Sequence, residues 1–257
     1  LIFDNDDGHK LVRRIDLPVF SEGIRGFAAN LENHSAYFST QNPRIGAFDL
    51  ETDQIIWEQT YQLGSDRSSV TLDGKKIYVP TGWWVSGDDS GLLVLNGENG
   101  ELIKHVRIGD SAHNSLVSVD GRFLYLGTTM MLTVLDTENE EVIHQIAPVG
   151  ESGGQGAFPF TVDSANRIAY VSLGSHVGFD VVDLAQERIL HHVLVGDEPI
   201  EHRTHGAALT PDETELWISD QEGRKLFIFD ATQMPPVLTG DVDLSQGGHG
   251  WVTFSLD

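Results

Sequence analysis

The feature that most constrains the fold of this chain is a sequence motif that recurs along its whole length, a short apolar strand that ends in an acidic turn. Full copies end at 70–73, 117–120, 160–163, 209–212 and 254–257, and a looser copy ends at Glu32. The acidic residues of consecutive copies are 41 to 49 residues apart. A repeat of about 40–50 residues built from short strands is typical of a β-propeller blade.

Each repeat contains four predicted strands. In the second repeat they cover 68–72, 76–80, 91–95 and 101–108. Apolar residues alternate along them, and Asp-Gly and Asn-Gly pairs separate them, as expected for strands joined by tight turns. No segment has a helical pattern of useful length. The sequence therefore predicts an all-β fold, a propeller of four-stranded antiparallel blades.

The repeat also predicts the domain organisation, because no linker-like stretch interrupts it. We expect one domain over 1–257 with incomplete blades at both ends, 1–18 holding two outer strands and 246–257 one inner strand. Whole blades are predicted at about 19–64, 65–109, 110–150, 151–196 and 197–245. Since blades must close a ring without an open edge, we expect a truncated seven-bladed propeller, with six blades as the alternative.

Charge and composition narrow the range of partners. The chain has 39 acidic residues against 16 Lys and Arg, a formal net charge of -23. Such a surface repels nucleic acid and anionic membranes, so neither is an expected partner. Cysteine is absent, which excludes disulfides, thiolate catalysis and Cys-based metal sites. No apolar stretch is long enough to span a bilayer.

The sequence of the repeat resembles the YVTN repeat of quinoprotein-like bacterial propellers. Gly109, Gly150 and Gly196 stand at the Val-Gly position of that repeat, 210–212 matches its Ser-Pro-Asp, and 124–126 matches its Tyr-Val. The resemblance covers essentially the whole chain. It implies a propeller fold and export to the periplasm or the exterior. The family includes surface-layer proteins, lactonase-like enzymes and binding proteins, so it leaves the function open.

Aligning the repeats gives one position per blade at the start of each innermost strand, where ring symmetry brings side chains together at the channel mouth. That position is occupied in turn by Arg25, Asp66, His113, Gly156, His205 and Gly250, with His249 beside the last. The following position is occupied by Gly26, Arg67, Asn114, Ala157, Gly206 and Trp251. A purely structural repeat would place similar residues throughout, so this variation predicts a site.

Three uses fit these side chains. His113, His205 and His249, with Asp66 as a further donor, could hold a divalent metal. Alternatively, Arg25 and Arg67 could bind a carboxylate while a neutral His113 or His205 acts as a general acid or base. The third use is ligand binding without chemistry. A structural interpretation also stands, in which the side chains satisfy loop carbonyls and channel water.

Two further segments lie on the same predicted face. The segment 201–206 contains His202 and Arg203 beside His205. The longest predicted loop contains Trp83 and Trp84, whose rings could form a stacking wall for a sugar. The structural alternative is that at least one of the two indoles packs beneath its own loop.

Three functions remain open at this point. The first is an exported module that binds a small anionic or carbohydrate ligand at the channel mouth, with or without a divalent metal. The second is a lyase or lactonase-type hydrolase with His113, His205 and Arg67 as catalytic residues. His205 and His249 are similar to the histidine pair of virginiamycin B lyase, which implies magnesium. The third is a scaffold that binds another protein.

Overall fold

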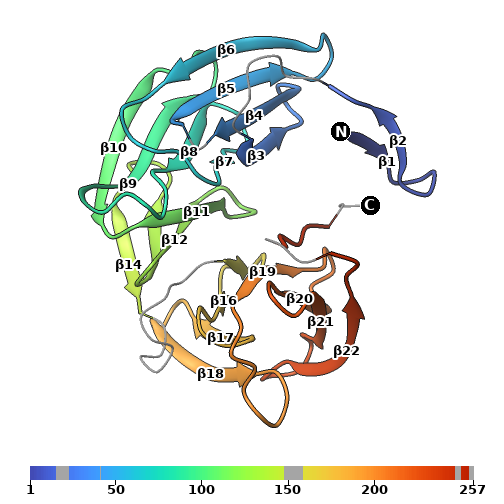
Figure 1. The fold of residues 1–257 in the computed structure, drawn as a ribbon. Helices are drawn as coiled ribbons and strands as arrows, with labels where there is room; N and C mark the ends of the chain where they lie inside the picture. The colour runs from blue at the N-terminus through green and yellow to red at the C-terminus, as the bar shows by residue number, and fades with distance from the viewer. Residues whose placement is uncertain (16–22, 41, 148–158, 247–249, 255–257) are drawn as a thin grey trace.

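The computed structural model describes residues 1–15, 23–40, 42–147, 159–246 and 250–254, and Figure 1 shows its blades arranged around a central axis. In these residues there are five four-stranded sheets and one two-stranded sheet, and all of their strands pair antiparallel. The predicted all-β propeller of four-stranded blades is confirmed. No helix with the length and apolarity of a membrane span occurs in the described ranges.

The strands follow the predicted order of four per repeat. The N-terminal hairpin is β1 (Ile2–Asp4) and β2 (Lys10–Arg13). The first blade is β3 (Ile24–Asn30), β4 (Ser35–Thr40), β5 (Arg44–Asp49) and β6 (Gln54–Thr60). The second is β7 (Ser69–Val70), β8 (Lys76–Pro80), β9 (Gly87–Asn96) and β10 (Leu102–Gly109). The third is β11 (Ala112–Val117), β12 (Phe123–Thr128), β13 (Leu132–Asp136) and β14 (Val142–Ile146). The fourth is β15 (Phe160–Val162), β16 (Ile168–Ser172), β17 (Gly178–Asp183) and β18 (Arg188–Leu194). The fifth is β19 (Thr204–Leu209), β20 (Glu215–Asp220), β21 (Lys225–Asp230) and β22 (Val237–Asp243).

The first strand of each blade is an edge strand and lies nearest the axis. The sheets are ordered β3-β4-β5-β6 and so on around the ring, with β6, β10, β14, β18 and β22 outermost. The starts of the inner strands therefore meet at one end of the channel, and the turns that follow them meet at the other end. Asp residues form the hairpin turns between the two outer strands, as when Asp136 accepts the Glu138 N–H at 2.7 Å.

The hydrophobic core lies between consecutive blades, because the two middle strands of each blade are buried on both faces. Tyr37 and Trp57 of the first blade pack with Val79 and Leu93 of the second. Equivalent clusters join the second blade to the third, the third to the fourth and the fourth to the fifth. Each blade thus completes the core of its neighbour, which is why a propeller repeat folds as an array.

The ends of the chain agree only in part with prediction. The predicted outer hairpin in 1–18 is present as β1 and β2, and Arg13 fixes it to the first blade by donating to Asp53 at 3.0 Å. The inner strand predicted in 246–257 is not formed over 250–254, which pairs with no sheet. Residues 247–249 and 255–257 lie outside the described ranges, and the total number of blades stays a prediction.

Besides the apolar clusters, an ion pair joins the second and third blades. The Lys76 ammonium donates to the Glu140 carboxylate at 2.5 Å and to the Thr137 carbonyl at 2.9 Å. The side chain of Glu140 is only 7% exposed. Since a buried carboxylate depends on its partner, removal of the lysine from this pair destabilises the fold more than removal of one member of a surface ion pair.

Lys76→Met should therefore lower the free energy of unfolding by roughly 2 kcal/mol, because it leaves the Glu140 carboxylate buried with only the more distant Lys104 nearby. Urea unfolding at neutral pH measures the change. Lys75→Met is the matched control, since Lys75 pairs with Asp73 on the surface and should change stability little. Equal effects of the two substitutions would contradict this role for Glu140.

Candidate functional site

The starts of the inner strands bring together most of the side chains that the repeat alignment selected. The Arg67 guanidinium carbon lies 3.9 Å from the centroid of the Trp251 ring, a cation–π contact between the second blade and the C-terminal segment. The same indole is 5.6 Å from the His113 ring and 5.2 Å from the His205 ring, between centroids. Four predicted residues that are far apart in sequence thus surround one point on the axis.

These residues lie inside the channel and not at an exposed mouth. Asp66, His113, Asn114 and His205 are 2%, 6%, 4% and 5% exposed. The His113 and His205 rings contact each other edge to face, with centroids 5.9 Å apart. Ring symmetry thus brings His113, His205 and Trp251 into contact, but they lie deeper in the channel than the sequence predicted.

Two glycines allow the inner strands to approach so closely. A Cβ on Gly26 would lie 2.6 Å from the Asp66 carbonyl oxygen, and a Cβ on Gly206 would lie 2.1 Å from the Gly250 carbonyl oxygen. Both glycines occupy the repeat position that Arg67 and Trp251 occupy in the neighbouring segments. Because Gly26 and Gly206 have no side chain, the neighbouring backbone that leads into Arg67 or Trp251 can lie directly against them.

Burial shifts the pKa values of the cluster. Desolvation raises the pKa of Asp66 to about 7, although the Arg25 charge and the backbone N–H groups of Arg67 and Trp83 oppose the shift. Desolvation, with His205 and Arg67 nearby, lowers the pKa of His113 to about 3. Burial also lowers the pKa of Arg67 to about 10, which leaves its guanidinium charged at neutral pH. The cluster thus combines a neutral imidazole, a charged guanidinium and a carboxyl group that titrates near neutrality.

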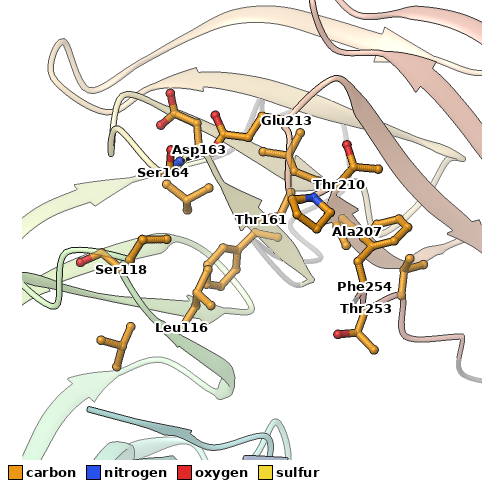
Figure 2. Close-up of a pocket in the computed structure, with 18 of the residues that line it drawn as sticks. Leu116, Ser118, Thr161, Asp163, Ser164, Ala207, Thr210, Glu213, Thr253 and Phe254 are labelled. Carbon is orange, nitrogen blue, oxygen red and sulfur yellow. Dashed lines mark hydrogen bonds between the residues drawn. The ribbon is translucent and has the colours of Figure 1, made fainter. Parts of the chain in front are cut away.

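A cavity of about 460 Å³ runs along the axis from this cluster toward the opposite end of the channel. Arg67, Asn114 and Trp251 line its inner end. Its walls come from β11, β15, β19 and the segment 250–254, and Figure 2 shows Leu116, Thr161, Ala207 and Phe254 around it. Asp163 and Glu213 line the outer end, where the turns after the inner strands begin. This volume is in the range of small-molecule sites.

The remaining predicted residues lie around the cluster or apart from it. Arg25 lies over the Trp84 ring at 5.0 Å, and that indole packs against the backbone of Gly64 and Gly82, as the structural alternative required for one of the two tryptophans. Trp83 is 52% exposed and contacts Trp84 edge to face. None of these residues lines the cavity.

Residues of the segment 201–206 contact either the fifth blade or the buried cluster. His202 has its Nδ1 3.1 Å from Asp220 Oδ2, so it joins the loop to the fifth blade and not to the cluster. Arg203 contributes a positive charge that acts on His113. From this loop His205 contacts the Trp251 indole, with the ring centroids 5.2 Å apart.

Two of the three predicted imidazole ligands of a metal, His113 and His205, lie in the described ranges. In the described ranges, no group of three or more His, Asp and Glu side chains is placed to hold a metal ion. His249, the third imidazole of the predicted set, lies outside those ranges, as do Gly156 and Ala157. His113 and His205 provide two nitrogen donors, whereas magnesium prefers oxygen ligands.

Sequence reasoning missed the cavity and its outer end. Leu116, Phe160 and Phe254 were assigned only to strands, and the acidic residues at the ends of the inner strands served only as markers of the repeat. The position of these acidic residues in the repeat could have indicated the outer end of the cavity, because residues such as Asp163 recur once per blade at the same end of the inner strand. Ring symmetry places them around the axis just as it places Asp66 and His113.

Known proteins resemble the chain in fold alone. It matches no protein-family model and no curated protein. Among solved structures, the hydrazine synthase of Kuenenia stuttgartiensis superposes with a TM-score of 0.61 at 14% identity over 88% of both chains. The β-propeller domain of Cps50 (Swd1) of Myceliophteria thermophila superposes with a TM-score of 0.72 at 10% identity, over 95% of this chain and 80% of that one. The fold is that of a β-propeller.

The two shifted pKa values predict opposing effects of pH on stability. Asp66 titrates at about 7 when folded and near 3.9 when unfolded, so its contribution to stability falls as pH rises from about 4 to about 7. His113 titrates at about 3 when folded and near 6.5 when unfolded, so its contribution is lost as pH falls through that interval. In the wild type the two effects should largely cancel.

Single substitutions should separate these effects. Between pH 4.5 and pH 6.5 the stability of Asp66→Asn should rise relative to wild type, and that of His113→Gln should fall, each by roughly 2 kcal/mol. Urea unfolding at the two pH values measures both slopes. Parallel pH profiles for the wild type and both variants would show that neither group is perturbed by burial.

Proposed function

We propose that this chain is a ligand-binding propeller whose central channel takes up a small molecule with an anionic group, held by Arg67. The observation that carries the proposal is the inner end of the cavity, where a charged guanidinium lines a partly open space of about 460 Å³. Arginine binds carboxylate and phosphate through parallel N–H donors, and such charge-assisted hydrogen bonds are strengthened where water is excluded.

The charge of Arg67 is incompletely balanced by the protein. In the described part of the chain no carboxylate forms a salt bridge with its guanidinium, which instead lies against the Trp251 ring. Asp66 acts on it through space, but that carboxyl group is partly protonated at neutral pH, because burial raises its pKa to about 7. An anionic group at the inner end would supply the missing negative charge.

Asn114 supports the same location. It is 4% exposed, lines the cavity, and has a side-chain oxygen without a hydrogen-bond partner in the described residues. That oxygen has almost no accessible surface, so a ligand reaches it only if the Asn114 amide rotates toward the cavity. Because buried polar atoms are nearly always paired, a hydroxyl or N–H group of the ligand would favour that rotation.

We further propose that the chain is an exported propeller of the YVTN type, because its repeat sequence resembles the YVTN repeat. The lyase or lactonase alternative has less support, since of its three catalytic residues only Arg67 lines the cavity, while His113 and His205 do not, and the third predicted metal ligand, His249, lies outside the described ranges. The scaffold alternative has no specific contact in its favour. The binding function therefore accounts for more of the observations.

Substitution of Arg67 tests the proposal. Isothermal titration of the wild type with a panel of small carboxylates, sugar acids and inorganic phosphate should find at least one that binds. Arg67→Leu should weaken that binding by about 10- to 100-fold, the size of a lost charge-assisted contact. Arg122→Leu is the matched control, because Arg122 lies over Phe123 outside the cavity.

Two results would contradict the proposal. One is a wild type that binds no member of the panel at millimolar concentration. The other is a member that binds the wild type, Arg67→Leu and Arg122→Leu equally well, which would place the anion elsewhere.

A further inference from the structure

The two ends of the cavity carry opposite charge. Arg67 lies at the inner end, whereas Asp163 and Glu213 line the outer end. Beside this outer end lie two more acids, Asp120 and Asp212, whose pKa values are held below their usual range by hydrogen bonds from Ser118 and Thr210. A ligand entering here passes ionised carboxylates before it reaches the guanidinium.

This arrangement disfavours a simple anion. On a chain with a net charge of -23, a lone carboxylate or phosphate must reach Arg67 against the repulsion of the outer end and therefore binds weakly. A molecule with a positive group at one end and a negative group at the other removes this conflict, since each group then lies beside its opposite charge.

The length of the cavity gives the separation of the two groups. Asn114 and Ser118 both line it and are four residues apart along the third blade's inner strand, which corresponds to about 13 Å at about 3.3 Å per residue. The Arg67 side chain occupies part of the inner end. An extended tripeptide spans about 10 Å between its terminal ammonium and carboxylate groups.

The walls present main-chain groups. β11, β15 and β19 are edge strands of their sheets and face the axis, and an edge strand carries N–H and C=O groups that no neighbouring strand pairs. At its start, β11 already pairs with an extended segment. The Arg67 N–H donates to the His113 carbonyl at 3.2 Å, and the Ser115 N–H donates to the Arg67 carbonyl at 3.2 Å. Beyond Ser115 the same edge continues along the cavity.

Glu213 is suited to bind the positive end. Its Oε1 accepts the backbone N–H of Ser164 at 2.5 Å, which fixes the carboxylate at the outer end, and Figure 2 shows it beside Asp163 there. Asp163 is already occupied by the backbone N–H groups of Arg167 and Ile168. Glu213 therefore has more bonding capacity left for an ammonium group.

We propose that the ligand class of the channel is a short extended peptide, bound with its C-terminal carboxylate at Arg67 and its N-terminal ammonium at Glu213. This rests on the proposed anion site and adds the chemistry of the rest of the molecule. Once its amide rotates toward the cavity, the side-chain oxygen of Asn114, which has no partner in the described residues, accepts an N–H group near the carboxylate end. Main-chain pairing along the inner strands makes binding tolerant of side-chain identity.

Tripeptide libraries with altered ends test this proposal. Equilibrium dialysis followed by mass spectrometry compares three forms of one mixed tripeptide library, with free ends, with an amidated C-terminus and with an acetylated N-terminus. The wild type should retain the free form at least tenfold better than either blocked form. Arg67→Leu should lose the preference for a free carboxylate, and Glu213→Gln the preference for a free ammonium.

The variants are chosen so that folding does not decide the outcome. Glu213→Gln keeps an oxygen that accepts the Ser164 N–H, and Glu141→Gln, an exposed residue on the outer side of the third blade, is the matched control. Free and acetylated peptides that bind the wild type equally would overturn the peptide assignment. Tripeptides that do not bind, alongside carboxylates that bind through Arg67, would overturn the assignment and leave the anion site intact. Failure of both ligand sets would remove the anion site as well.

Discussion

The contact between Arg67 and Trp251 is the interaction on which the centre of this propeller depends. It joins the second blade to the C-terminal segment across the axis, at 3.9 Å between the guanidinium carbon and the ring centroid. Both imidazoles of the cluster contact the same indole, and the cavity begins on its other side. The position of this one ring therefore determines the burial of His113 and His205 and the inner end of the cavity.

The contact is possible because the inner strands approach each other at two glycines. A side chain on Gly26 or Gly206 would overlap the carbonyl oxygen of Asp66 or Gly250. These carbonyls belong to the residues immediately before Arg67 and Trp251. The spacing between the strands thus sets where the two side chains project, and the apolar clusters between the blades hold that spacing.

The balance of charge follows from the same geometry. The surface is strongly acidic, yet the buried cluster contains a charged guanidinium beside a carboxyl group that burial leaves partly protonated. Positive potential is therefore concentrated inside the channel and negative potential at its outer end. This separation supports an oriented ligand with charge at both ends, in preference to a simple anion.

The sequence predicted the fold well because strand alternation and turn residues are local signals. The bounds of β8, 76–80, were predicted to the residue, and the repeat correctly placed His113 and His205 together. It did not predict that these residues are buried, since the depth of a side chain in the channel depends on how neighbouring strands pack. The inner strand expected within 246–257 is not formed over 250–254, because local alternation says nothing about whether a partner strand lies beside it.

The cavity escaped prediction for a related reason. Its walls combine residues such as Leu116, Phe160 and Phe254, whose apolar character indicates only a strand, and the space between them arises from the arrangement of three inner strands around the axis. Trp251 was selected by its repeat position, but its stacking on Arg67 depends on the path of the C-terminal segment. No spacing in the sequence encodes that path.

A double-mutant cycle on Arg67 and Trp251 tests the central claim most directly. Urea unfolding of wild type, Arg67→Leu, Trp251→Leu and the double variant gives their coupling energy, for which a buried cation–π contact predicts about 1–2 kcal/mol. The same cycle on Arg122 and Phe123, whose contact is longer at 5.1 Å, should give a smaller coupling energy. A coupling between Arg67 and Trp251 that is indistinguishable from zero would contradict a channel organised around this contact.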